Sequence, residues 1–196
     1  MMAENYQLVD RTPQGPLSMH PKKFALWLFM VTVVMVFAAF TSALIVRQSQ
    51  GNWEIYDLPQ QFVVNTGIIL LSSVFLQLAF AAAKKDNVQR LKWLMVLVTA
   101  LGVAFLAGQW TAWGDLVDEG LYFSGGNVAT SFLYVITAVH AAHLIGGVIY
   151  LLYVLISSFR YRVHSKNMLN MEMCTTFWHF LGGLWVYLYI FLLLNH

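Results

Sequence analysis

The sequence predicts an all-α integral membrane protein with five transmembrane helices, and three observations support this fold class. Hydrophobic residues make up 59% of the 196 residues and charged residues 10%, whereas charged residues are about 25% of soluble globular domains. Five apolar runs are long enough to cross a hydrocarbon core of about 30 Å, which takes roughly 20 helical residues. These runs do not alternate in polarity, which favours helices over a transmembrane β-barrel.

The predicted spans cover residues 24–46, 62–83, 91–113, 131–156 and 173–194. Apart from Lys92, none of them contains Asp, Glu, Lys or Arg. Residues 1–23 are polar and contain most of the prolines, and they lack the apolar core of a signal peptide. We therefore expect a cytoplasmic N-terminal arm over residues 1–23 and a single five-helix bundle over residues 24–196.

The distribution of basic residues predicts the orientation of the bundle. All of the 11 Lys and Arg residues except Arg47 lie in the N-terminal arm or at the connections after the second and fourth spans. The connection after the third span contains Asp115, Asp118 and Glu119 and no basic residue. Because Lys and Arg are enriched in cytoplasmic loops, we expect the N-terminus in the cytoplasm and the C-terminus outside.

Small residues indicate where helices approach closely, because helix packing in lipid depends on them. The third span has a stripe of small residues, and the last two spans each have a glycine pair that predicts close packing against a neighbour. These residues are Ala100, Ala104, Ala107 and Gly108 in the third span, Gly146 and Gly147 in the fourth, and Gly182 and Gly183 in the fifth.

The candidate functional residues lie in the last two spans. His140 and His143 share one helix face, and Glu172 and His179 share another. A polar side chain at membrane depth is costly, which favours a functional role, but a neutral histidine can also hydrogen-bond within the bundle. Trp178 and its neighbouring aromatic residues are more typical of packing or of the membrane interface. The single cysteine excludes an intramolecular disulfide.

Three function classes fit these residues. A haem anchor would use His140 or His143 with His179 as axial ligands of one iron. His179 lies about 9 Å and His143 about 19 Å from the cytoplasmic ends of their spans, and this difference in depth counts against the pair. A transporter would place ionisable groups near the midplane, often in inverted repeats, and the spans contain neither carboxylates nor a repeat. A structural subunit would use the polar residues for helix contacts and lipid head groups.

An ordered series of short motifs runs through most of the chain after residue 24. The motifs are Trp27-Leu28-Phe29, Leu58-Pro59, Asn65-Thr66, Ser72-Ser73, Leu101-Gly102, Phe105-Leu106, Gln109, Ser131-Phe132, His140 with His143 and Gly147, Glu172, Phe177-Trp178-His179-Phe180 and Trp185. In this order and spacing, the sequence resembles subunit III of haem-copper terminal oxidases, the cytochrome c and quinol oxidase group, in its short five-helix bacterial form. The Trp-His-Phe block is the most specific part of the resemblance.

The resemblance implies an accessory subunit with no catalytic centre, cofactor or metal of its own, in an oxygen-reducing respiratory complex of the bacterial inner (plasma) membrane. Family members bind subunit I, hold structural phospholipids and support proton uptake and turnover stability. Haem, copper and the site for the electron donor are expected on partner subunits; a supercomplex is a further possible assembly, and no nucleic acid is expected. The residues expected to make interhelical or lipid contacts are His140, His143, Arg160, Arg162, Glu172, Trp178 and His179.

The sequence departs from the family pattern at three positions where family members commonly have an acidic residue. These positions are Val33 in the first span, Ala112 in the third and Gly182 in the fifth. Any role of those carboxylates in the family is therefore not expected of this chain.

Overall fold

The computed structural model describes residues 20–50, 58–123, 128–160 and 168–195, and the regular secondary structure within these ranges is helical. The helices are α1 (Pro21–Gln48), α2 (Gln61–Lys84), α3 (Val88–Asp118), α4 (Val128–Phe159) and α5 (Leu169–Leu194). Each contains one predicted span, and each is long and apolar enough to cross a membrane. The predicted all-helical class is thus confirmed for the described residues.

The helices are longer than the predicted spans because polar residues end an apolar run without ending a helix. The five helices contain 24 to 32 residues, or about 36 to 48 Å at 1.5 Å per residue, which exceeds the hydrocarbon thickness of about 30 Å. At the start of α1, the His20 ring accepts a hydrogen bond from the Lys22 backbone N–H at 3.2 Å. Pro21 takes the first helical position, where its missing N–H has no cost, so the last residues of the predicted arm are helical.

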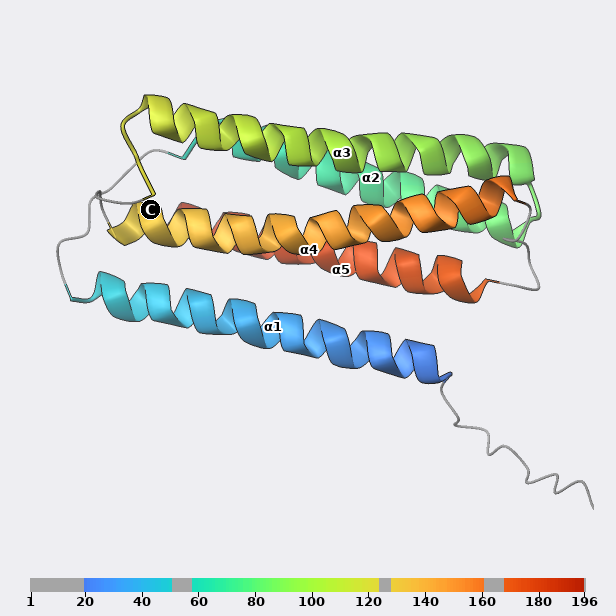
Figure 1. Cartoon of the computed structure of the whole chain (residues 1–196), viewed down its shortest axis with the longest axis horizontal. Helices are drawn as coiled ribbons and strands as arrows, with labels where there is room; N and C mark the ends of the chain where they lie inside the picture. The colour runs from blue at the N-terminus through green and yellow to red at the C-terminus, as the bar shows by residue number, and fades with distance from the viewer. Residues whose placement is uncertain (1–19, 51–57, 124–127, 161–167, 196) are drawn as a thin grey trace, which may run out of the picture.

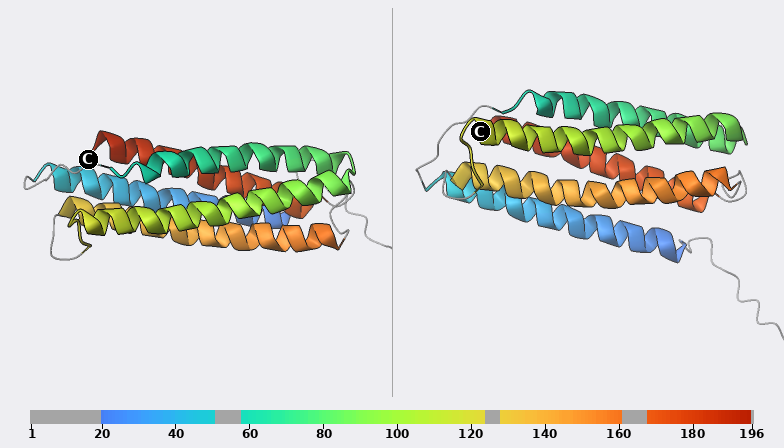
Figure 2. Two further views of the ribbon diagram at one scale, coloured as in Figure 1. Left: turned by 90° about the horizontal axis from the view of Figure 1, so that it is seen from above. Right: turned by 45° about the horizontal axis from the view of Figure 1, so that its top comes forward.

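Successive helices run in opposite directions along one common axis (Figure 1). Helices α2, α3, α4 and α5 form a closed four-helix ring, in which each helix contacts the next and α5 contacts α2. Within the described residues, α1 contacts only α4 and α5, so it lies outside the ring. Figures 1 and 2 show α1 along one side of the other helices.

The Trp178 side chain of α5 lies at the centre of the ring and is 1% exposed. Its indole N–H donates a hydrogen bond to Ser72 Oγ of α2 at 3.0 Å. A Cβ atom on Gly102 of α3 would lie 2.8 Å from Trp178 Cη2, and one on Gly147 of α4 would lie 3.3 Å from the same ring. The indole therefore contacts the other three helices of the ring, and two glycines provide the space for it.

A second tryptophan, Trp185, lies two turns further along α5. Its indole N–H donates to Thr66 Oγ1 of α2 at 3.0 Å. Its ring meets Phe62 of α2 and Phe105 of α3 edge-on, with centroid separations of 5.7 Å and 4.9 Å. The separation from the His140 ring of α4 is 5.1 Å. Two tryptophans on one face of α5 thus connect it to the rest of the ring.

The glycine pairs behave as the sequence predicted, whereas the small stripe of the third span does not. Gly147 packs against α5 and Gly182 packs against Ser73 and Ile69 of α2, so each pair supplies one close helix contact. In α3, Gly108 faces Asn65 of α2. The other members of the stripe, Ala100, Ala104 and Ala107, are exposed. Ala107 lies about 100° from Gly108 around the helix, so the two residues cannot face the same neighbour.

Candidate functional site

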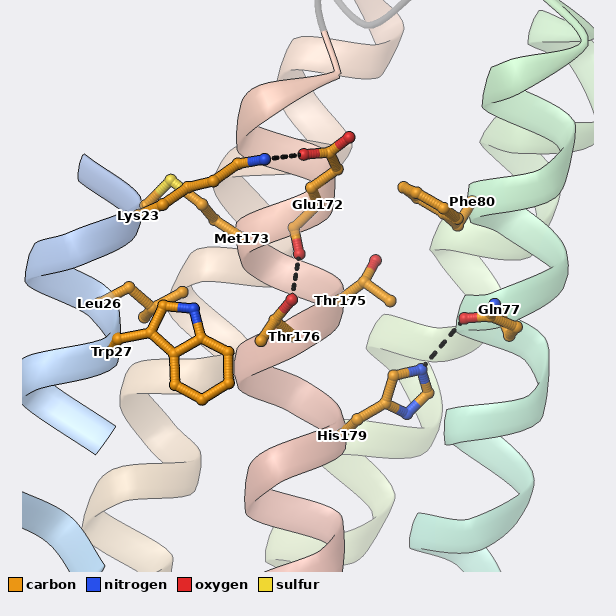
Figure 3. Close-up of a pocket in the computed structure, with 10 residues that line it drawn as sticks. All are labelled: Lys23, Leu26, Trp27, Gln77, Phe80, Glu172, Met173, Thr175, Thr176 and His179. Carbon is orange, nitrogen blue, oxygen red and sulfur yellow. Dashed lines mark hydrogen bonds and ion pairs between the residues drawn. The ribbon is translucent and has the colours of Figure 1, made fainter. Parts of the chain in front are cut away.

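The predicted residues Glu172 and His179 line one pocket between α1, α2 and α5 (Figure 3), with a volume of about 400 Å³. It lies at the end of the bundle where α1 and α5 begin and α2 ends, which also holds most of the described basic residues and is here called the basic end. The lining residues are Lys23, Leu26, Trp27, Gln77, Phe80, Glu172, Met173, Thr175, Thr176 and His179.

The charged groups of this pocket neutralise each other. Lys23 Nζ of α1 forms an ion pair with Glu172 Oε2 of α5, and both side chains are more than one third exposed. This ion pair connects the peripheral helix to the ring. The pocket therefore presents one positive and one negative group side by side.

The deeper wall of the pocket is polar but uncharged. His179 Nε2 lies 3.3 Å from Gln77 Oε1 of α2, within hydrogen-bond distance. The hydroxyl groups of Thr175 and Thr176 donate to backbone carbonyls one turn earlier in α5. The exposed ring of Trp27 from α1 forms part of the opposite wall. This pocket combines a charged mouth with polar and apolar walls.

The two histidines of α4 lie elsewhere. His140 is fully buried, its ring contacts Phe37, Phe105 and Trp185, and neither ring nitrogen has a hydrogen-bond partner among the described residues. The Nδ1–H of His143 donates to the Val139 carbonyl at 2.7 Å. The His143 ring packs against the aromatic rings of α1 and lines a separate hollow between α1 and α4.

The predicted contact residues therefore separate into several places. Glu172 contacts Lys23 of α1 and His179 contacts Gln77 of α2. Trp178 belongs to the core. Arg160 is exposed just after the end of α4, and Arg162 lies outside the described residues.

Sequence reasoning did not select Lys23 and Gln77, although they partner the two predicted residues. A signal for Lys23 was present, because the positive-inside rule places it at the same end as Glu172. The sequence has no signal for how α1 is rotated about its axis, and this rotation brings the side chains of Lys23 and Glu172 together. An amide in an apolar helix, such as Gln77 of α2, is typical of helix contacts, but the sequence does not say which helix it contacts.

The histidines do not fit the haem-anchor alternative. Axial ligation needs two side chains that approach one iron from opposite sides. His179 is bonded to Gln77 of α2, whereas His143 faces α1 and lines a different hollow. His140 is enclosed by aromatic rings. Within the described part of the chain, no cluster of three or more His, Cys, Asp or Glu side chains is placed to bind a metal ion.

The three positions that depart from the family pattern are all buried. Val33 is 1% exposed and Ala112 is fully buried. At Gly182, a Cβ atom would already lie 3.3 Å from Ser73 Oγ. A carboxylate at these positions would lose its hydration within an apolar interior, which is costly without a partner. Small or apolar residues are therefore compatible with the packing here.

The fold and the pocket define a multi-pass membrane protein in which several polar side chains connect neighbouring helices. The family model described as "Cytochrome c oxidase subunit III" matches residues 16–195. Because this match covers nearly the whole chain, the protein belongs to the subunit III family of the cytochrome c and quinol oxidases. This finding confirms the resemblance seen in the sequence and removes the transporter and haem-anchor alternatives.

Individual relatives agree with the family assignment. The chain is 29% identical to the cytochrome bo(3) ubiquinol oxidase subunit 3 of Pseudomonas aeruginosa, over 83% of this chain and 79% of that protein. It is 26% identical to the protein of the same name from Buchnera aphidicola, over 89% and 94% of the two chains. It is 23% identical to the probable quinol oxidase subunit 3 of Staphylococcus haemolyticus, over 96% and 94%.

Proposed function

We propose that this chain is a non-catalytic accessory subunit that binds subunit I of a respiratory haem-copper oxidase and holds structural phospholipid. The observation that supports this proposal most directly is the use of its polar groups. Lys23 and Glu172 neutralise each other, and His179 is bonded to Gln77. These groups secure helices and shape a pocket; electron transfer and oxygen reduction belong to the haem and copper of partner subunits.

A shallow groove along α4 is the face best suited to subunit I. Its floor consists of the exposed small residues Ala138, Ala142 and Gly146, spaced four apart, which permits close approach of another helix. Two hollows of about 370 Å³ and about 450 Å³ lie along it, one beside α3 and one beside α1. The groove thus has the shape and composition of a helix contact.

The histidine beside this groove favours a protein partner over lipid. His143 uses Nδ1 for a backbone carbonyl, and its Nε2 makes no hydrogen bond within the described residues. It lies 16 residues before Phe159, or about 24 Å from that end of α4, where lipid supplies no polar group. A side chain donor on a helix of subunit I would satisfy it. The exposed face of α3 lacks this feature, since Thr111 donates its hydroxyl to the Gly108 carbonyl.

The pocket of Lys23, Glu172 and His179 suits a phospholipid head group. The Lys23 ammonium can bind a phosphate, and the Glu172 carboxylate can bind an ammonium. The apolar side chains of Leu26 and Phe80 line the same pocket and can contact the start of an acyl chain. A charge-balanced mouth of this kind favours a head group that carries both charges. We assign to this lipid the support of turnover stability and of proton uptake by subunit I.

We propose that the basic end faces the cytoplasm of a bacterial cell and that the membrane is the inner membrane. The described basic residues at this end are Lys22, Lys23, Lys84, Lys85, Arg90, Lys92 and Arg160. The opposite end has the acidic residues Asp115, Asp118 and Glu119 and the base Arg47. The positive-inside rule relates this asymmetry to orientation.

Alanine-to-phenylalanine substitutions test the docking face. Ala142→Phe fills the groove on α4, so the tagged subunit should recover several-fold less subunit I from membranes solubilised in mild detergent. Ala104→Phe, on the exposed face of α3, is the matched control and should recover the wild-type amount. Equal recovery of subunit I by both variants, with both subunits present in the membrane at wild-type levels, would exclude this groove.

Removal of the polar wall tests the lipid pocket and the accessory role. His179→Phe deletes the contact with Gln77, so phospholipid bound per purified oxidase should fall while the initial rate of oxygen consumption stays near wild type. Loss of activity should then develop during sustained turnover. Ala104→Phe, at an exposed position of α3 outside the pocket, should change neither quantity. An immediate loss of electron transfer with the subunit still bound would contradict a non-catalytic role.

A reporter fused after His196 tests the orientation. Because five spans separate the ends of the chain, alkaline phosphatase at this position should be active, as this enzyme works only outside the cytoplasm. The same reporter placed in the turn between α2 and α3 should be inactive. The reverse pattern would overturn the assignment of the basic end to the cytoplasm.

A further inference from the structure

The turn between α2 and α3 forms a second polar hollow at the basic end, separate from the pocket of Lys23 and Glu172. Its volume is about 170 Å³. Lys85, Asn87 and Arg90 form its polar side, and Leu78, Ala81 and Ala82 form its apolar side. From these residues we propose that the hollow binds the phosphate of an anionic phospholipid, such as phosphatidylglycerol, and selects it over zwitterionic lipid.

Hydrogen bonds hold the backbone of the turn, so the backbone positions of its polar residues are well defined. The N–H groups of Lys85 and Asn87 both donate to the Ala82 carbonyl, at 3.2 Å and 3.0 Å. The Asn87 side chain accepts from the Arg90 backbone N–H at 3.2 Å and caps α3. Asp86 takes a φ of 51°, which completes the reversal of the chain. Lys85 and Arg90 therefore lie on either side of a defined turn.

No ion pair joins Lys85 or Arg90 to a carboxylate of the described residues. The ion pair between Lys23 and Glu172 lies outside the hollow. The neighbouring Lys84 differs, since its ammonium lies over the Phe80 ring, 4.6 Å from the centroid. Asp86 belongs to the turn but does not line the hollow. The hollow thus presents two positive groups, whereas the first pocket presents one of each sign.

This difference in charge decides which head group each site prefers. A guanidinium group can bind two oxygens of one phosphate, and an ammonium adds a point charge beside it. Phosphatidylglycerol has the phosphate as its only charge. A zwitterionic head group would bring its own ammonium toward Lys85 and Arg90, which repel it. The hollow therefore favours anionic lipid, and the pocket of Lys23 and Glu172 favours zwitterionic lipid.

The position of the hollow favours a lipid over free phosphate. It lies where α2 leaves the membrane, with Lys84 as the last residue of that helix. Leu78, Ala81 and Ala82 continue from the cations toward the hydrocarbon, along the last two turns of α2. An acyl chain can contact these apolar side chains while its phosphate contacts Lys85 and Arg90. Inorganic phosphate would leave this apolar surface unused.

Native mass spectrometry of the purified full-length subunit, titrated with phosphatidylglycerol or phosphatidylcholine in detergent, tests the proposal. Each cation near a membrane surface contributes about fivefold to the binding of anionic lipid. The double substitution Lys85→Gln with Arg90→Gln should therefore weaken phosphatidylglycerol binding about 25-fold and leave phosphatidylcholine binding unchanged. Wild-type subunit should prefer phosphatidylglycerol at this site, and millimolar inorganic phosphate should not displace it.

The matched control removes two cations of the same end that do not line the hollow. Lys84→Gln with Lys92→Gln has the same net charge as the test variant, so it should retain most of the phosphatidylglycerol affinity. Equal losses in both double variants would show attraction to a diffuse basic surface and overturn the site. Displacement by phosphate, or no preference for anionic lipid in the wild type, would also overturn it.

The anionic-lipid site rests on one part of the proposed function, which is that the chain resides in a membrane. The lipid site and the accessory role can therefore be contradicted by separate results. All four substituted side chains lie at the bundle end, and both double variants should still recover wild-type amounts of subunit I. Loss of phosphatidylglycerol binding with subunit I retained supports the hollow. Failure of wild-type subunit to recover subunit I would contradict the accessory role and leave the lipid titration unaffected.

Discussion

The insertion of the Trp178 indole between three neighbouring helices is the constraint on which the rest of the structure depends. The ring fills the centre of the bundle, where Gly102 and Gly147 supply the space. Its N–H group needs a polar acceptor, because apolar side chains and lipid cannot accept a hydrogen bond. Ser72 supplies it. Since association of helices in lipid depends on close packing and hydrogen bonds, one side chain that does both fixes the relative positions of all four helices of the ring.

The outer parts of the molecule follow from this rigid centre. With α5 fixed, its first turn holds Glu172 at the basic end, where it pairs with Lys23 and attaches α1. Helix α1 lacks contacts with α2 and α3 in the described residues, so a pocket remains between it and α2. The exposed face of α4 is likewise left open between α1 and α3. Sites for lipid and for a partner subunit thus arise where the peripheral helix does not complete the bundle.

The sequence was sufficient for the fold class and for five helices, because an apolar run of about 20 residues has few alternatives in a membrane. It did not determine where the helices end, since α3 continues through Asp115 and Asp118 at the depth of the head groups. It also did not determine which face of a helix is buried. Ala107 and Gly108 are both small, and only the position of Asn65 in the structure makes Gly108 the contact.

The sequence could select single residues of the candidate site, but it could not predict which residues of other helices contact them. Membrane depth selected Glu172 and His179 as unusual residues, and the structure places both in the lining of the same pocket. Their partners come from other helices, and Lys23 is 149 residues from Glu172 along the chain. Contacts of this kind depend on the rotation of each helix about its axis, which the packing of Trp178 and Trp185 sets and which no local pattern records.

The most direct test of the central role of Trp178 is the free energy of unfolding of the full-length subunit in detergent, compared between two glycine substitutions of α3. Gly102→Ala places a methyl group 2.8 Å from the indole, so it should lower this free energy by about 1–3 kcal/mol through overpacking. Gly114→Ala adds the same methyl group in open space and should be neutral or slightly stabilising. Equal stability of the two variants would contradict a structure organised around the Trp178 indole.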